Sequence, residues 1–282
     1  MSDNTANSEL RNTWESAAPG WARWERTLSE GLADATDALI DMAGVRPGMR
    51  VLDVACGAGN QSLRVAERVG SSGSVVASDI SATMLEFVRA NAARAGVLNI
   101  ETREYAAENL DEADGPFDAA ICRVGLMLFP SPRKALEALQ RVLKPSGRFA
   151  ALVFTTPANN PYMAQPMAIL MQYAGKSPPA PGQPGIFALG GEGILEGLMK
   201  ESGFVDVQTQ TVRAQLRLPS ASDALEMMQQ AFGVYRAIVA NLDPEEKARA
   251  WNEVHKCLKR FESNGNFETE LEFIIGSGAR PT

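Results

Sequence analysis

Hydrophobic positions follow two alternating spacings between residues 45 and 154. Short apolar runs predict buried strands at Arg50–Ala55, Ser74–Ser78, Ile100–Glu104, Phe117–Cys122 and Arg148–Phe154. Between these runs, apolar residues spaced three and four apart predict helices at Ser62–Val69, Ala82–Ala95 and Pro132–Leu143. Strands that alternate with helices form a parallel sheet with helices on both faces. Residues 45–154 are therefore expected to form an α/β core.

The segment before this core predicts helices. Trp14 lies in a short helical stretch, which Pro19 and Gly20 are expected to interrupt. A second helix is then predicted from apolar positions that share one face: Trp21, Trp24, Leu28, Leu32, Ala35, Leu39 and Met42. We expect residues 1–44 to form N-terminal lid helices.

The segment after the core changes in composition. A loop rich in proline and glycine, SPPAPGQPG, covers residues 177–185. The pattern beyond it predicts helices at Ile194–Ser202, at Ala221–Ala240 and from Asp243, and strands at Val205–Thr211 and Glu270–Ile275. We expect residues 155–282 to form a cap insertion and the remaining strands, in one continuous domain with the core.

Composition and charge narrow the class of protein. The 282 residues are 45% hydrophobic and 22% charged, which is typical of a folded globular chain. A formal charge of −7 argues against nucleic acid as a partner, and no apolar run is long enough to span a membrane. Three isolated cysteines without metal-ligand spacing indicate free thiols and no metal site. We expect a cytoplasmic protein that is a monomer or a homodimer.

The sequence VLDVACGAGN, residues 51–60, places a glycine loop after the first strand. It lacks the lysine and hydroxyl of a nucleoside triphosphate loop. It also differs from the dinucleotide motif GxGxxG, because Ser62 stands at the third glycine. Asp53 at the strand tip suits a cationic ligand such as S-adenosylmethionine better than a pyrophosphate. Asp79, about 20 residues after Gly59, could bind the ribose of either S-adenosylmethionine or NAD.

Five motifs in order carry a family resemblance: VLDVACGAGN, VVASDIS, YAAENLD, FDAAICRVGLMLFP and ALEALQRVLKPSGRFA. Together they resemble the class I S-adenosylmethionine-dependent methyltransferases. Within these, the chain is most similar to the branch of ubiquinone/menaquinone-biosynthesis and bacterial small-molecule methyltransferases. The resemblance covers residues 45–154 and extends to the rest only in architecture. It implies a Rossmann-like seven-stranded sheet that is mostly parallel with the last strand antiparallel, and S-adenosylmethionine as cofactor.

The resemblance also implies a cofactor site. The residues that would line the methionine moiety are Asp53, Ala55, Gly57 and Gly59. Asp79 would hold the ribose, and Ile80 would pack on the adenine. Ala107 and Glu108 would flank the adenine, and Arg123 would face the cofactor and the reaction centre. Ala106 stands where the family often has aspartate, so the group that recognises the adenine amino group stays open.

The implied reaction is an in-line displacement that moves a methyl group to a small, apolar or aromatic metabolite. A general base is needed only if the nucleophile must lose a proton, and no residue is assigned as catalytic. The single histidine, His255, is interpreted as an ordinary helical residue. The predicted substrate-binding residues are Trp14, Trp21, Trp24, Tyr162, Met228 and Phe232.

Two alternatives remain at this stage. One is an NAD(P)-dependent oxidoreductase, because Asp79 fits both ligands. The other is a non-methylating cofactor-binding protein or cyclase on the same fold. The acceptor, and whether its O, N or C atom is methylated, cannot be read from the sequence.

Overall fold

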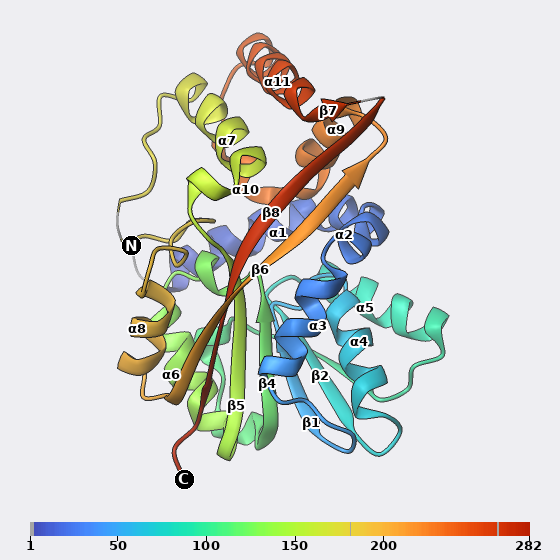
Figure 1. Ribbon diagram of the computed structural model, residues 1–282, viewed down its shortest axis with the longest axis vertical. Coiled ribbons are helices and arrows are strands. Elements are labelled where there is room, and N and C mark those ends of the chain that lie inside the picture. The colour runs from blue at the N-terminus through green and yellow to red at the C-terminus, as the bar shows by residue number, and fades with distance from the viewer. Residues whose placement is uncertain (1–2, 181, 264) are drawn as a thin grey trace.

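A computed structural model describes residues 3–180, 182–263 and 265–282. Its strands form one sheet in the order β3-β2-β1-β4-β5-β8-β6, and a short β7 pairs with β8 (Figure 1). The strands are β1 (Arg50–Val54), β2 (Ser74–Asp79), β3 (Ile100–Glu104), β4 (Phe117–Arg123), β5 (Leu143–Phe154), β6 (Val205–Leu218), β7 (Glu262–Ser263) and β8 (Asn266–Ala279). β8 is antiparallel to β5, β6 and β7, whereas the pairs among β1 to β5 are parallel. The predicted fold class is confirmed, with β7 as an addition to the seven-stranded path.

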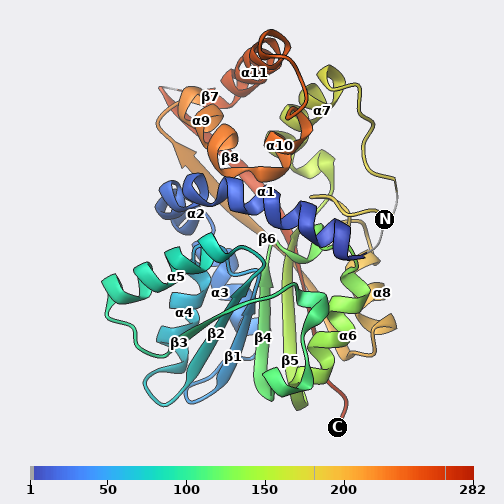
Figure 2. The same cartoon turned by 180° about the vertical axis from the view of Figure 1, so that it is seen from behind.

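Helices cover both faces of this sheet. They are α1 (Asp3–Arg23), α2 (Glu25–Gly31), α3 (Ala33–Met42), α4 (Asn60–Val69), α5 (Ala82–Ala95), α6 (Pro132–Val142), α7 (Pro161–Tyr173), α8 (Ile194–Glu201), α9 (Ala221–Ala231), α10 (Gly233–Ile238) and α11 (Pro244–Leu258). α3 and α4 lie on one face, and α6 and α8 lie on the other (Figures 1 and 2). The chain order reverses between β1 and β4, and such a switch point opens a crevice at the carboxyl ends of the strands.

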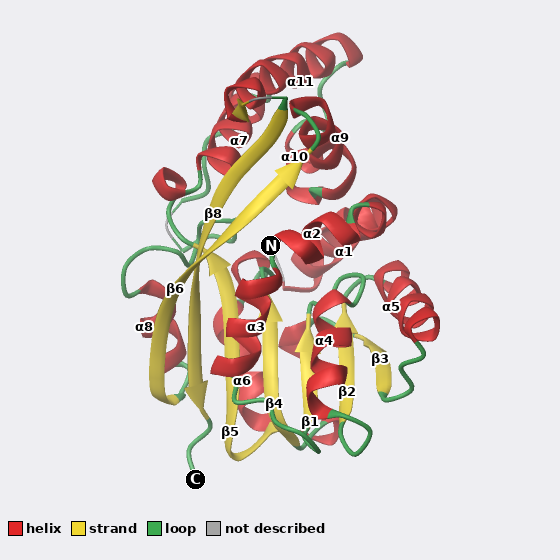
Figure 3. Ribbon diagram, turned by 45° about the vertical axis from the view of Figure 1, so that its right-hand side comes forward, coloured by secondary structure: helices red, strands yellow, loops and turns green. Residues whose placement is uncertain are grey.

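A cap rises above the sheet on two long strands. β6 and β8 are 14 residues each, whereas β1 has five. β5 ends where Phe154 pairs with Phe273, but β6 and β8 stay paired as far as Leu218 and Phe267. The free halves of these strands carry α7, α9, α10 and α11 (Figure 3). α1 crosses the molecule between this cap and the strand ends (Figure 2).

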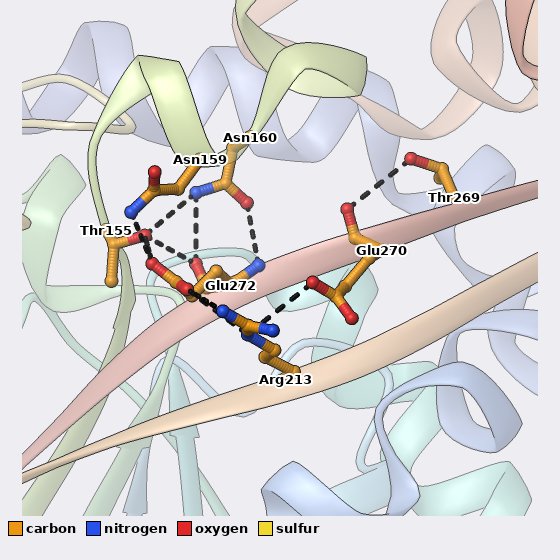
Figure 4. Close-up of polar contacts among 7 residues, drawn as sticks. All are labelled: Thr155, Asn159, Asn160, Arg213, Thr269, Glu270 and Glu272. Atoms are coloured by element: carbon orange, nitrogen blue, oxygen red, sulfur yellow. Dashed lines mark hydrogen bonds and ion pairs between the residues drawn. The ribbon is translucent and has the colours of Figure 1, made fainter.

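A polar joint fixes the point where the cap leaves the sheet (Figure 4). The Asn160 side-chain amide takes the place of a neighbouring strand: its oxygen accepts from the Glu272 amide at 2.9 Å and its nitrogen donates to the Glu272 carbonyl at 3.0 Å. The Glu272 carboxylate accepts hydrogen bonds from Thr155, Asn159 and Arg213. This joint, made of these five residues, anchors the start of α7 to β8.

The N-terminal helices differ from the prediction. α1 runs unbroken through Pro19, although proline removes a backbone hydrogen bond. Tertiary packing compensates, since α1 lies so close to α9 that a Cβ on Gly20 would come within 2.1 Å of the Gln230 carbonyl oxygen. The chain instead breaks at Trp24 and at Leu32, so the single predicted helix is divided into α2 and α3.

Four further elements also differ. The predicted helix 221–240 is divided at Phe232, whose φ of −86° and ψ of +86° lie outside the helical region. β6 and β8 extend past their predicted ranges because each continues as the other's partner beyond the end of β5. α7 was not predicted. Within the described ranges, no helix is both long and apolar enough to cross a membrane.

Candidate functional site

A cavity of about 660 Å³ opens at the carboxyl ends of β1, β2 and β4, beneath α1. We call it the strand-end cavity. Seven of the nine predicted cofactor-binding residues line it: Ala55, Gly57, Asp79, Ile80, Ala107, Glu108 and Arg123. The other lining residues are Asn7, Leu10, Trp14, Trp21, Val54, Met84, Tyr105, Ala106, Val124, Gly125, Leu128 and Phe129. The crevice predicted by the strand order is therefore where the sequence motifs converge.

The glycine loop forms part of the floor of this cavity. Gly57 and Gly59 have φ angles of +56° and +92°, in the left-handed region where glycine is favoured. A Cβ on Gly57 would lie 3.0 Å from the Trp21 indole nitrogen, so the indole covers the loop closely. Gly59 caps the start of α4 against Val88 and does not line the cavity. The loop therefore has one face toward a ligand and one toward the core.

Asp79 supplies the carboxylate of the strand-end cavity. It is the last residue of β2 and is 8% exposed. One oxygen accepts from the Gly57 amide at 3.0 Å, and the other accepts from the Ser81 amide at 2.9 Å. Burial raises the pKa of this carboxyl to about 6, which these backbone hydrogen bonds partly oppose. Each oxygen keeps a second lone pair, so the group can also accept from the two hydroxyls of a ribose.

Asp53 lies behind the cavity wall. It is fully buried and accepts from the Ser62 hydroxyl at 2.5 Å and from the Gln61 amide at 3.3 Å. Burial raises the pKa of its carboxyl to about 7, while the nearby Arg123 guanidinium opposes that shift. Asp53 is not among the residues that line the cavity. In the structure its carboxylate bonds side chains at the start of α4, and the contact with the methionine moiety stays a prediction.

Arg123 brings a buried cation to the cavity. It is 4% exposed and donates to the Thr36 hydroxyl at 3.0 Å. Its Nε has no hydrogen-bond partner within the described part of the chain. Burial lowers the pKa of the guanidinium to about 10, with Asp53 opposing that shift, so the group stays charged at neutral pH. A buried donor on a cation is suited to a carboxylate of a bound molecule.

The N-terminal helix α1 contributes more residues to this site than the two tryptophans that the sequence predicted. Asn7, Leu10, Trp14 and Trp21 all line the strand-end cavity from α1. Their spacings of three, four and seven residues put them on one helical face. Trp14 and Trp21 were predicted to bind the substrate, whereas Asn7 and Leu10 were not predicted, because the helix was expected to be interrupted at Pro19. Tyr105 and Ala106, directly after β3, also line the cavity and lie in a quoted motif.

A second cavity of about 710 Å³ adjoins the first, between the strand ends and the cap. We call it the apolar cavity. Its lining residues are Trp14, Trp21, Leu28, Gly31, Leu32, Val124, Met127, Leu128, Phe154, Tyr162, Met163, Ile186, Leu216, Phe232, Gly233, Val234, Tyr235, Leu271 and Phe273. Trp14, Trp21, Val124 and Leu128 line both cavities and form a shared wall. Two chambers of different polarity thus meet at four side chains.

The shared wall is built from packed and strained residues. Trp14 and Trp21 pack edge to face with ring centroids 5.7 Å apart. Val124, directly after β4, has a φ of +54°, which is strained for a β-branched residue. Strain of this kind persists only where the surrounding structure holds it, and it concentrates at functional sites.

Four of the six predicted substrate-binding residues line the apolar cavity, namely Trp14, Trp21, Tyr162 and Phe232. Trp24 points elsewhere, because its indole donates to the Gln230 side chain at 2.9 Å. Met228 is fully buried in the core and lines neither cavity. His255 lies outside both and contacts Ser222 at 3.2 Å. In the described ranges, no group of three metal-ligating side chains is assembled.

Comparison with known proteins identifies the family. A model described as the ubiE/COQ5 methyltransferase family matches residues 31–176, which is more than half of the chain. The chain belongs to this family. It is 42% identical over 123 residues to the ubiquinone/menaquinone biosynthesis C-methyltransferase UbiE of Haemophilus ducreyi, covering 43% of this chain and 48% of that protein. UbiE of Teredinibacter turnerae is 39% identical over 122 residues, covering 43% and 49%. The chain spans about half the length of the curated relatives it matches.

Solved structures support the fold over a longer range. A structure described as a putative methyltransferase from Bacillus halodurans has a TM-score of 0.58 at 19% identity, covering 88% of this chain and 100% of that one. The YcgJ protein from Bacillus subtilis has the same TM-score and identity, covering 89% and 99%. The [4+2]-cyclase SpnF has a TM-score of 0.53 at 19% identity, covering 88% and 80%. At these identities the likeness concerns the fold alone.

Membership of the family confirms the resemblance to S-adenosylmethionine-dependent methyltransferases, and S-adenosylmethionine is the cofactor of this family. The strand-end cavity fits that molecule chemically. Asp79 can accept from a ribose, Gly57 and Trp21 both line the cavity, and Arg123 has a buried donor for a carboxylate. The positions of individual contacts stay predictions.

Proposed function

We propose that this chain transfers the methyl group of S-adenosylmethionine to a small, apolar or aromatic metabolite. The observation that carries the proposal is the shared wall, at which a polar cavity and an apolar cavity meet. When bound, S-adenosylmethionine supplies an electrophilic methyl group on a sulfonium whose leaving group is a neutral thioether. The protein then has to align the acceptor and exclude water.

The residues of the strand-end cavity take the first part of this task in our proposal. Asp79 holds the ribose, and Arg123 binds the carboxylate of the methionine end. Gly57 and the Trp21 indole, which packs close to it, would border the bound cofactor. Asp53 lies behind the cavity wall, and its carboxylate opposes the lowering of the Arg123 pKa by burial.

The residues of the apolar cavity take the second part. Burial of an apolar acceptor against these side chains supplies about 25 cal/mol per Å² of surface removed from water. Tyr162 and Tyr235 are the titratable residues that line this cavity in the described part of the chain, and burial raises the pKa of both phenols. Neither is suited to accept a proton at neutral pH. The proposed acceptor therefore carries a reacting atom that is nucleophilic without a protein base in this cavity.

One pair of measurements tests the proposal. S-adenosylhomocysteine should raise the melting temperature of the protein and NADH should not, because ligands stabilise the state that binds them. Incubation with S-adenosylmethionine and a panel of phenols, amines and quinols should then give methylated product, detected by mass spectrometry. A shift with NADH alone would support the oxidoreductase. Binding of S-adenosylmethionine with no methylated product from any acceptor would support a non-methylating protein or cyclase.

A further inference from the structure

One hydroxyl in the wall of the apolar cavity lacks a hydrogen bond. Tyr162 lines this cavity and its side chain is fully buried. Its hydroxyl has no hydrogen-bond partner within the described part of the chain. The large majority of buried polar groups in proteins have a hydrogen-bond partner, so each exception calls for an explanation. A bound molecule that supplies the partner is one such explanation.

A second phenol in the same cavity provides the comparison. Tyr235 also lines the apolar cavity and is 1% exposed. Its hydroxyl donates to the Met163 carbonyl at 2.7 Å. Tyr235 is therefore satisfied by the protein alone, whereas Tyr162 is not. The unpaired state of Tyr162 is thus specific to that residue and does not follow from the position of a phenol in this wall.

The Tyr162 ring is held in place from two sides. It packs edge to face against Phe267, with ring centroids 5.6 Å apart, and against Phe261 at 6.1 Å. Two residues earlier, Asn160 of the polar joint bonds to both backbone groups of Glu272 (Figure 4). A side chain supported in this way presents its polar group at a fixed place, as recognition of a ligand requires.

The joint also holds neighbouring parts of the cavity wall. Phe154 precedes Thr155 of the joint, and Leu271 and Phe273 flank Glu272. All three line the apolar cavity beside Tyr162. The polar joint therefore sets the relative positions of the lone hydroxyl and the apolar surfaces around it.

The rest of the lining defines what the hydroxyl can recognise. No lysine, arginine, aspartate or glutamate is among the described residues that line the apolar cavity. A charged acceptor would lose its hydration there without gaining an ion pair, which is unfavourable. Burial also keeps the Tyr162 phenol neutral, and it can then donate one hydrogen bond or accept one.

We propose that Tyr162 determines acceptor specificity: its hydroxyl bonds a neutral oxygen, a carbonyl or a hydroxyl, on an otherwise apolar acceptor. This inference rests on the proposed function, since it treats the apolar cavity as the acceptor site. It adds the residue that selects among apolar acceptors.

Paired probes test this inference by calorimetry on the full chain saturated with S-adenosylhomocysteine. 1-Naphthol and 1-methylnaphthalene have similar size and differ by a hydroxyl in place of a methyl group. The wild-type protein should prefer 1-naphthol roughly threefold to tenfold, the range expected for one neutral hydrogen bond. Tyr162→Phe should remove this preference. Tyr235→Phe should keep the ratio of the two affinities, even if both affinities change.

Three results would overturn the inference. They are equal binding of the two probes by the wild type, a preference that survives in Tyr162→Phe, and loss of the preference in Tyr235→Phe alone. The comparison of the two probes on the wild-type protein can overturn the inference even if a variant does not fold. Failure of the proposed function is distinguishable, because it would appear as no binding of S-adenosylhomocysteine or as no methylated product from any acceptor, and neither result is the ratio of the two probe affinities.

Discussion

The strand-end cavity and the apolar cavity share a wall but offer a ligand different kinds of interaction. The first presents the carboxylate of Asp79 and the guanidinium of Arg123. The second presents no charged side chain among the described residues that line it. A ligand in the first cavity is held by a few directional contacts, and one in the second is held by many small apolar contacts. Single substitutions should therefore have large effects in the first cavity and graded effects in the second.

The largest expected effect comes from Asp79→Ala. This change removes the carboxylate that we propose to bind the ribose, and hydrogen bonds to charged groups contribute about 1.5–3 kcal/mol each. The affinity for S-adenosylhomocysteine should fall roughly 100-fold in calorimetric titration. Asp118→Asn is the control, because Asp118 bonds Lys144 and the Arg50 amide and lines neither cavity. Unchanged affinity in Asp79→Ala would refute the placement of the ribose.

The charged cavity also predicts a pH dependence of stability. Burial raises the pKa of Asp79 to about 6 and of Asp53 to about 7, so the folded state keeps protons that the unfolded chain releases. The free energy of unfolding of the ligand-free protein should therefore fall as pH rises from about 4 to about 7, on the order of 3 kcal/mol for each group. Urea denaturation at several pH values measures it. Asp53→Asn should flatten the slope, and a slope that is unchanged in this variant would contradict the account.

Substitution at the shared wall should affect both cavities. Trp21→Ala removes an indole that covers Gly57 and lines both chambers, and should weaken binding of S-adenosylhomocysteine and of 1-naphthol by roughly tenfold each. Trp24→Ala is the matched control, because Trp24 lies three residues away and bonds Gln230. It should lower stability and leave both affinities near their original values. Loss of one affinity only in Trp21→Ala would mean that the wall is not shared.

The polar joint should matter more for stability than the charges beside it. Glu272 is 9% exposed and accepts from Thr155, Asn159 and Arg213, so Glu272→Gln should cost about 1–3 kcal/mol in the free energy of unfolding. Glu270, two residues earlier, forms an exposed ion pair with Arg213 at 3.5 Å. Glu270→Gln should cost less than about 1 kcal/mol. Chemical denaturation measures the free energy of unfolding of both variants. Equal losses in the two variants would contradict a larger contribution of the polar joint to stability.

The smallest effect is expected at His255. Its ring contacts the Ser222 hydroxyl outside both cavities. His255→Gln should leave methyl transfer unchanged at every pH measured, because the histidine has no contact with either chamber. Loss of activity on the acid side of the wild-type profile, absent in the variant, would assign it a role in proton transfer.

The two cavities also differ in how far the sequence predicts them. Most of the strand-end cavity lies within residues 54–129, at strand ends whose order the motifs mark. The glycine spacing and the position of Asp79 at the end of β2 therefore predicted lining residues of this cavity directly. For Asp53, the position in the chain does not tell whether the carboxylate faces a ligand or the Ser62 hydroxyl.

The apolar cavity could not be predicted to the same extent. Its lining comes from α1, α2, β5, α7, α10, β6 and β8, which only tertiary structure brings together. Leu216 and Leu271 look like any core residue of a strand in the sequence. Trp14 and Trp21 of α1 were predicted, but the single helix that presents both was not, because proline usually interrupts a helix and α1 continues through Pro19.

A crystal structure of the chain with S-adenosylhomocysteine tests the central claim most directly, because the claim concerns two cavities that meet at one wall. The account predicts the ribose against Asp79 and the sulfur facing the wall formed by Trp14, Trp21, Val124 and Leu128. Ligand found within the apolar cavity, or with its sulfur directed away from this wall, would contradict it.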